Sequence, residues 1–126
     1  MAEPSVVFRF LRPATLPAPM AGVLGGGVAA AGGWPGDSLR MVAAIVSAIL
    51  LTGASNGINQ IADVETDRIN RPERPIPSGR LGIGQAWAWV AALTAGSFAL
   101  AAWVNLPYLI CVGVTLPLTM AYSLPP

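Results

Sequence analysis

The sequence is short of charge. Charged residues make up 10% of the 126 residues, and the chain contains no lysine and no histidine. About a quarter of the residues of a typical soluble domain are charged, so this composition argues against a soluble globular protein. Apolar residues make up 54% of the chain and the mean hydropathy is +0.61, which predicts a chain that folds in a bilayer. The net charge of +1 supplies no basic face for a nucleic acid, because the arginines cluster with acidic residues.

Cysteine is equally scarce, since Cys111 is the single one. It excludes a disulfide within the chain, and no histidine stands near it to complete a metal site. We interpret it as a packing residue in the core or facing lipid.

Four apolar runs predict an all-α polytopic membrane helix bundle with about four transmembrane helices, in a single membrane domain that covers residues 1–126. An Arg- and Phe-rich segment precedes them and is typical of a helix at the membrane interface. A proline inside the last run predicts a kink. The runs are Thr15 to about Ala31, Met41 to about Asn56, Ile83 to Val104, and Leu106 to about Tyr122.

The first run has a second interpretation, a secretory signal peptide, because arginines precede it and Ala29–Ala31 suit a cleavage site. We favour a retained transmembrane helix, since the next run supplies the return span. Two arginines precede the first run and four follow the second, so both groups lie on one side of the membrane. The positive-inside rule makes that side cytoplasmic and predicts a multi-pass membrane protein with its charged loop in the cytoplasm.

That charged loop is the segment 56–80, NGINQIADVETDRINRPERPIPSGR, between the second and third runs. If the second helix continues through it, Asn59, Asp63 and Asp67 are spaced by four and form one polar stripe. Carboxylates on one helix face repel each other, so a cation should lie between them. We predict that Asn59, Asp63 and Asp67 bind Mg²⁺, which takes few protein carboxylates and completes its octahedron with water and phosphate oxygens.

The same segment contains Arg71, Arg74 and Arg80, whose guanidinium groups can contact a diphosphate in a bidentate manner. A diphosphate held at the membrane surface beside apolar helices predicts a polyprenyl diphosphate as the substrate. The competing interpretation pairs Arg71 with Asp67 at i,i+4 and leaves the other charges to solvate a cytoplasmic loop. Pro72 argues against that pairing, because it disfavours helical geometry at Arg71.

The stretch NQIADVETD followed by INRPERPIPSGR resembles the first aspartate-rich motif, NDxxDxxxD, of the UbiA-type intramembrane prenyltransferases. RPATLPAP and AYSLPP are also similar to that superfamily. The resemblance implies Mg²⁺-dependent transfer of a polyprenyl group to an aromatic, tetrapyrrole or lipid acceptor. It implies that Asn59, Asp63 and Asp67 hold metal and diphosphate, that Arg74 contacts the diphosphate, and that stabilisation of the departing diphosphate drives catalysis.

Two departures accompany this resemblance. Gln60 stands where many members have the first Asp of the motif; homogentisate-type enzymes resemble this chain there, whereas RPIPSG is closer to chlorophyll synthase-like and archaeal lipid-synthesis branches. The acceptor therefore stays open. Members typically have nine membrane helices and a second aspartate-rich motif in their later half, but no carboxylate follows Gly79 here. The chain thus resembles the N-terminal half of the fold.

Three explanations of the short chain stay open. It is the ordered part of a longer enzyme, half of a split enzyme, or a catalytically inactive homologue that serves as a structural subunit of a larger membrane complex. In the last case, small-residue faces such as that of Gly22 and Gly26 would contact helices of other membrane protein subunits. A transporter or channel is disfavoured, because the polar residues gather where a helix leaves the membrane rather than at its midplane.

Overall fold

The computed structural model describes residues 4–15, 17–32 and 36–123, and all regular structure in these ranges is helical. This confirms the predicted all-α class. Leu16 and residues 124–126, which belong to the RPATLPAP and AYSLPP stretches, lie outside the described residues. The elements are α1 (Pro4–Leu11), a 3₁₀ turn η1 (Pro13–Thr15), α2 (Pro17–Ala31), α3 (Ser38–Ala62), α4 (Val64–Asn70), α5 (Ile83–Val104) and α6 (Leu106–Ser123).

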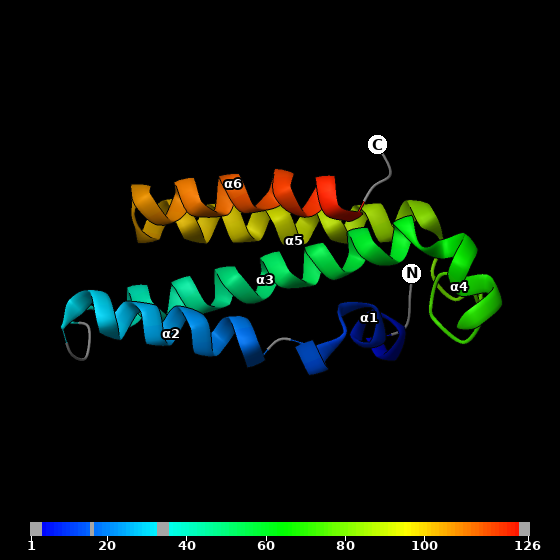
Figure 1. The fold of residues 1–126 in the computed structure, drawn as a ribbon, viewed down its shortest axis with the longest axis horizontal. Helices are drawn as coiled ribbons and strands as arrows, with labels where there is room; N and C mark the ends of the chain where they lie inside the picture. Colours follow the sequence, from blue (N-terminus) through cyan, green and yellow to red (C-terminus); the bar gives the residue numbers. More distant parts are fainter. Residues whose placement is uncertain (1–3, 16, 33–35, 124–126) are drawn as a thin grey trace.

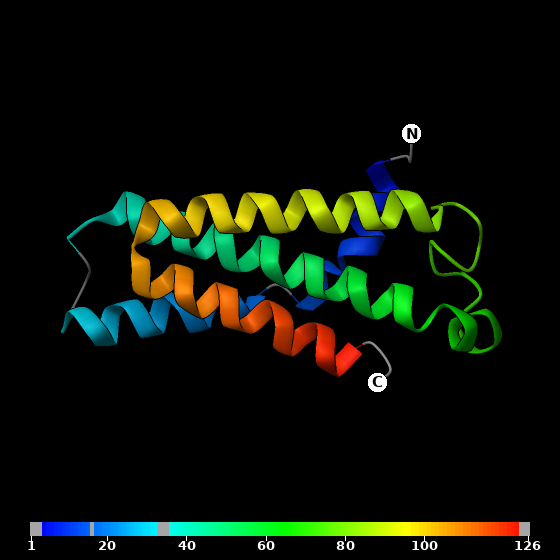
Figure 2. The same cartoon turned by 90° about the horizontal axis from the view of Figure 1, so that it is seen from above.

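Helix α3 is the centre of the bundle (Figures 1 and 2). It contacts each of the other five described α-helices. Helices α5 and α6 lie on one side of it and α1 and α2 on the other, while α4 lies at the far end of the bundle, beyond the last turn of α3 (Figure 1). The helices on both sides of the charged segment, α4 and α5, are therefore both positioned by contact with α3.

The two longest helices, α3 and α5, are long and apolar enough to cross a membrane. Their 25 and 22 residues correspond to about 37 and 33 Å at 1.5 Å per residue, against a hydrocarbon core of about 30 Å. Helix α2 and the apolar part of α6 are shorter, and Pro117 lies inside α6, which continues through it. By length and composition, α3 and α5 are thus the candidate membrane spans among the described helices.

Small residues allow the helices to approach closely. A Cβ atom added at Gly57 of α3 would lie 2.8 Å from Phe10 Cζ of α1 and 2.8 Å from Val90 Cγ2 of α5. Farther along the same interface, Ser47 of α3 meets Ser97 of α5, and both are fully buried. Glycine and serine at these positions let α1 and α5 pack directly on the backbone of α3.

One hydrophobic cluster connects α1, α3, α4 and α5 with the loop that follows α4. It lies at the end of the bundle where the charged segment leaves α3 (Figure 1). The loop and α4 are consequently fixed to the helical core rather than exposed on all sides. The buried members are Val6, Phe10, Ala54, Ile58, Val64, Ile76, Leu81, Ala86, Val90 and Leu93.

The charged segment differs from its prediction in two respects. Helix α3 runs from Ser38 to Ala62, so it is longer than the predicted Met41–Asn56. It does not continue through the whole motif: Asp63 (φ −92°, ψ 7°) separates α3 from α4, so the continuous helix assumed for the four-residue spacing is interrupted at that residue. Val64, the first residue of α4, is buried in the hydrophobic cluster.

Candidate diphosphate site at the junction of α3 and α4

The three predicted metal ligands lie on consecutive turns across the α3–α4 junction. Asn59 is in the last turns of α3, Asp63 is the junction residue and Asp67 is in α4. The backbone N–H of Asp63 donates to Asn59 O at 2.9 Å, and that of Asp67 donates to Asp63 O at 2.8 Å. The four-residue spacing therefore stays helical at both steps, although the axis bends. Asp63 is exposed, Asn59 is half-buried and Asp67 is buried.

An ion pair fixes the buried carboxylate. Arg74 NH1 donates to Asp67 Oδ2 at 2.9 Å, and the two side chains are 25% and 8% exposed. The alternative that paired Asp67 with Arg71 is wrong. Arg71 is the C-cap of α4, with φ −142° and ψ 60° outside helical geometry. Its backbone N–H donates to Asp67 O and closes the last turn, whereas the ion pair of Asp67 is formed by Arg74.

The other arginines of the segment are exposed. Arg68 forms an ion pair with Glu65 at 2.8 Å on the outer surface of α4. Arg71 and Arg80 form no ion pair with any residue that the structure describes. Two exposed guanidinium groups of the charged segment are thus available to an anionic ligand.

The loop between α4 and α5, residues 71–82, is folded by its own hydrogen bonds. Backbone bonds join Ser78 N to Arg74 O at 3.0 Å and Leu81 N to Pro75 O at 3.0 Å, and Gly79 has the left-handed φ of +82°. Ile76 and Leu81 of this loop are buried in the hydrophobic cluster. The loop therefore holds Arg74 against Asp67 from a defined position.

The donor set fits a hard cation that keeps part of its hydration shell. The side chains of Asp63, Asp67 and Asn59 contain oxygen atoms, the ligand type that Mg²⁺ prefers, and Mg²⁺ is usually bound by one or two carboxylates plus substrate phosphates. Within the described ranges, no three His, Cys, Asp or Glu side chains come together as a metal-binding group. A cation here would accordingly take its remaining ligands from water, from a diphosphate or from protein beyond this segment.

Two amide side chains near the C-terminal end of α3 bond the segment that ends α1, a contact that the sequence did not predict. Gln60 donates through Nε2 to Phe10 O of α1, and Asn56 donates through Nδ2 to Leu11 O at 3.0 Å and to Thr15 Oγ1 at 2.8 Å. Their i,i+4 spacing placed both amides on one face of α3. The sequence contained no signal that the short first helix ends against that face.

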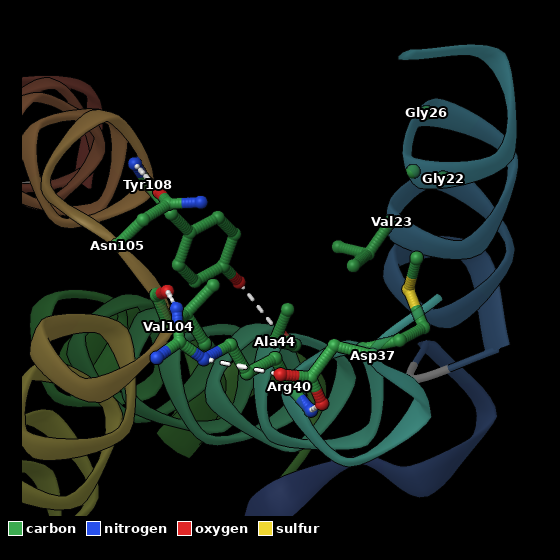
Figure 3. Close-up of a pocket in the computed structure, with 11 residues that line it drawn as sticks. Gly22, Val23, Gly26, Asp37, Arg40, Ala44, Val104, Asn105 and Tyr108 are labelled. Atoms are coloured by element: carbon green, nitrogen blue, oxygen red, sulfur yellow. Dashed lines mark hydrogen bonds and ion pairs between the residues drawn. The ribbon is translucent and has the colours of Figure 1, made fainter. Parts of the chain in front are cut away.

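A cavity of about 600 Å³ lies at the opposite end of the bundle from α4, between α2, α3 and the α5–α6 turn (Figure 3). Its polar groups bond one another or the backbone. Arg40 pairs with Asp37 at 3.3 Å and donates to Val104 O at 3.2 Å, and the Tyr108 hydroxyl donates to Ala44 O at 2.7 Å. These contacts tie the ends of α3, α5 and α6 together, so we interpret them as structural.

Comparison with known proteins adds family evidence to this geometry. The model of the UbiA prenyltransferase family matches residues 20–125. The digeranylgeranylglyceryl phosphate synthase of Methanoculleus marisnigri is 49% identical over 61 residues, which are 48% of this chain and 21% of that protein. The chloroplastic coumarin 8-geranyltransferase 1 of Citrus limon is 36% identical over 72 residues, which are 57% of this chain and 18% of that protein.

A solved structure from work on digeranylgeranylglyceryl phosphate synthase in membranes superimposes with a TM-score of 0.89 and 24% identity. The superposition covers 94% of this chain and 42% of the solved chain. The likeness shows that the helices are arranged as in the corresponding part of that protein. The matched segments span about a fifth of the two relatives' length and less than half of the solved chain.

Proposed function

Because the chain belongs to the UbiA prenyltransferase family, we propose that it is part of an enzyme that transfers a polyprenyl group from a polyprenyl diphosphate to an acceptor in the membrane. The observation that carries the proposal is the α3–α4 junction, where Asp63 and Asp67 follow each other by one turn at the end of a full-length membrane span. A lipid diphosphate would have its head at this junction and its tail along the apolar helices.

The reaction breaks the bond between the allylic carbon and the diphosphate oxygen. The electron pair leaves with the diphosphate, and the allylic cation is captured by a nucleophilic atom of the acceptor, which loses its proton. Bound Mg²⁺ would stabilise the charge that develops on the departing diphosphate. The chain's own residues have the tasks of holding that cation, binding the diphosphate oxygens and keeping water from the allylic carbon.

We assign these tasks as follows. Asn59, Asp63 and Asp67 hold Mg²⁺ through oxygen atoms. Arg71 and Arg80 bind diphosphate oxygens, for which their exposed guanidinium groups are suited. Arg74, which the motif resemblance assigned to the diphosphate, contacts Asp67 in the structure, so we assign it to orienting that carboxylate.

The acceptor and the membrane side are parts of the same proposal. Several of the relatives are digeranylgeranylglyceryl phosphate synthases, which makes a prenylated glycerol phosphate the first acceptor to test. The arginines that precede α2 and those that follow α3 favour a cytoplasmic position for the α3–α4 junction. The remaining wall of the substrate site would come from a longer form of the enzyme or from a second subunit, since the relatives are longer than the matched segments.

The test is a transfer assay with the purified protein and whatever copurifies with it, reconstituted in lipid nanodiscs. Radiolabelled geranylgeranyl diphosphate and geranylgeranylglyceryl phosphate are supplied with Mg²⁺. We expect Asp63→Asn and Asp67→Asn each to reduce transfer by at least about 100-fold, because loss of a residue that only orients a metal ligand already costs about 10–100-fold. Chelation of divalent cations should stop the reaction, and added Mg²⁺ should restore it.

The matched control is Glu65→Gln, which makes the same chemical change at an exposed carboxylate on the outer surface of α4. It should leave transfer unchanged. Full transfer by an Asp63→Asn, Asp67→Asn double variant would refute the proposal. Fixed-ratio copurification with other membrane proteins and no transfer activity would instead support the alternative of a catalytically inactive structural subunit.

A further inference from the structure

The C-terminal end of α1 is capped by side chains of α3. The last carbonyl groups of a helix have no partner within the helix and need donors from elsewhere. Here Gln60 Nε2 donates to Phe10 O and Asn56 Nδ2 donates to Leu11 O. The chain then leaves the helix at Arg12, whose φ of +53° is the left-handed conformation that commonly ends helices.

This contact is buried and specific. Gln60 is 3% and Asn56 7% exposed, and Phe10 is fully buried against Gly57 between the two amides. A carbonyl oxygen accepts only from an N–H or O–H group, so the amide nitrogen of Gln60 is committed to α1. Loss of the Gln60 amide would leave the buried Phe10 carbonyl without this donor, and loss of the Asn56 amide would do the same to the partly buried Leu11 carbonyl; an unpaired carbonyl is costly away from water.

The same contact lies next to the candidate diphosphate site. Gln60 follows Asn59 directly and precedes Asp63 by less than one turn. The hydrophobic cluster that contains Phe10 of α1 also contains Val64 of α4 and Ile76 of the following loop. Helix α1 therefore packs in the same hydrophobic cluster as α4 and the following loop, the elements that contain Asp67 and Arg74.

We propose that Gln60, together with Asn56, is a positioning residue: it docks α1 across the end of α3 and thereby fixes the junction that holds Asp63 and Asp67. In this chain Gln60 is not a metal ligand, although it stands inside the aspartate-rich motif. It lies beneath α1, whereas Asp63 is exposed. The consequence for cation binding rests on the proposed function, but the docking of α1 does not.

Docking is tested by hydrogen–deuterium exchange of the full chain in nanodiscs, which requires no enzymatic activity. Gln60→Glu replaces the donor with an acceptor of the same size. We expect amide exchange over residues 4–12 to accelerate about tenfold, as for a locally released helix, with no change in α5. Gln60→Met keeps the length and apolar packing of the side chain but has no donor, so it should also accelerate amide exchange over residues 4–12. This uncharged variant serves as a second test in case Gln60→Glu does not fold.

The matched control is Gln85→Glu, at the other glutamine of the chain. Gln85 uses its Oε1 to accept from Gly82 N at 3.0 Å, so a glutamate there keeps the contact. Exchange over residues 4–12 should match the wild type in this variant. Unchanged exchange over residues 4–12 in both Gln60 variants would overturn the docking role.

The positioning role is tested by Mn²⁺ binding in the presence of inorganic diphosphate, followed by electron paramagnetic resonance. Gln60→Asp restores the carboxylate that many family members have. If Gln60 faced the cation, this variant would bind Mn²⁺ more tightly; if Gln60 positions the junction, it would bind about tenfold more weakly. Equal or tighter binding overturns the proposal.

Phe10→Ala supplies the discriminating comparison, because it loosens α1 without changing any polar group near the cation. It should weaken Mn²⁺ binding in the same direction as Gln60→Asp. Normal Mn²⁺ binding in Phe10→Ala would show that α1 does not act on the junction. Absence of Mn²⁺ binding by the wild-type chain would contradict the proposed function, and the exchange experiment would then decide the docking of α1 by itself.

Discussion

Ser47 and Ser97 connect the two membrane-spanning helices by a reciprocal contact. Each hydroxyl donates to the backbone carbonyl oxygen of the other residue at 2.8 Å, and the two hydroxyl oxygens lie 3.0 Å apart. Both residues are fully buried between α3 and α5. Because the bilayer supplies no water to replace these bonds, the pair fixes the register of the two helices.

Removal of this contact should weaken the α3–α5 interface measurably. We expect the double variant Ser47→Ala, Ser97→Ala to lower the free energy of unfolding by about 1 kcal/mol, since hydrogen bonds between membrane helices are worth roughly 0.6 to 1.7 kcal/mol. Thr115→Val is the control, because Thr115 donates only within α6, to Cys111 O. Steric-trap unfolding in bicelles measures both variants, and equal stability of the double variant and the control would contradict the expectation.

The ion pair of Asp67 with Arg74 should contribute more to the free energy of unfolding than the ion pair of Glu65 with Arg68 on the outer surface of α4. Arg74→Gln leaves a carboxylate that is 8% exposed without its cation, whereas Arg68→Gln removes a partner from Glu65, which is 79% exposed. We expect losses of roughly 3 kcal/mol for the buried pair and less than about 1 kcal/mol for the surface pair. Thermal unfolding in detergent compares the two variants, and similar losses would mean that Asp67 gains solvent when Arg74 is absent.

The two exposed arginines of the loop should act on substrate binding rather than on folding. Arg71→Gln and Arg80→Gln should each raise KM for the prenyl diphosphate roughly tenfold, because a charge-assisted hydrogen bond contributes about 1.5–3 kcal/mol. Their melting temperatures should equal that of the wild type, since both side chains are exposed. Arg68→Gln serves as the charge-matched control for KM. An equal rise of KM in that control would indicate a general effect of net charge.

Gly57 should not tolerate a side chain. A Cβ atom there would lie 2.8 Å from both Phe10 Cζ and Val90 Cγ2, so Gly57→Ala must displace α1 or α5. We expect a loss of about 1–3 kcal/mol from overpacking. Gly113 of α6 has no atom within 4 Å of its added Cβ, and Gly113→Ala should be neutral or stabilising through helix propensity. Opposite signs in thermal unfolding confirm the expectation, and equal signs contradict it.

The proposed membrane orientation can be tested with single cysteines in a Cys111→Ser background. Gly36 precedes α3 and Ser78 lies in the loop after α4, and both residues are exposed. The start of α3 and helix α4 lie at opposite ends of the bundle (Figure 1). In sealed right-side-out vesicles, an impermeant maleimide should label Gly36→Cys and not Ser78→Cys. Inverted vesicles should give the reverse pattern, and the opposite result in both preparations would place the α3–α4 junction outside.

The helix boundaries show what the sequence could predict. The third run, Ile83–Val104, was predicted at the bounds of α5, because its apolar stretch is uninterrupted up to Asn105, which caps the helix. The end of α3 was predicted too early. Asn56 and Gln60 look like the polar end of a span, yet they remain helical and buried because α1, about 50 residues away in sequence, supplies acceptors for their amides.

The candidate site also has one part that the sequence predicts and one part that depends on packing. The spacing of Asn59, Asp63 and Asp67 is a local property, and the helical turns across the junction preserve it. The bend at Asp63 and the choice of Arg74 as the partner of Asp67 depend on how the following loop packs into the hydrophobic cluster. Periodicity contains no information on that packing, so sequence reasoning weighed only the nearer Arg71 as a partner of Asp67, argued against it because of Pro72, and did not find Arg74.

The loop that follows α4 has a thermodynamic consequence for any ligand bound there. Its prolines, Pro72, Pro75 and Pro77, each restrict φ, its backbone bonds close it on itself, and Ile76 and Leu81 anchor it. Ordering a flexible backbone costs about 1–2 kcal/mol per residue. An anion bound by Arg71 and Arg80 would therefore restrict two side chains and almost no backbone, so most of its electrostatic attraction would appear as affinity instead of being spent on loop ordering.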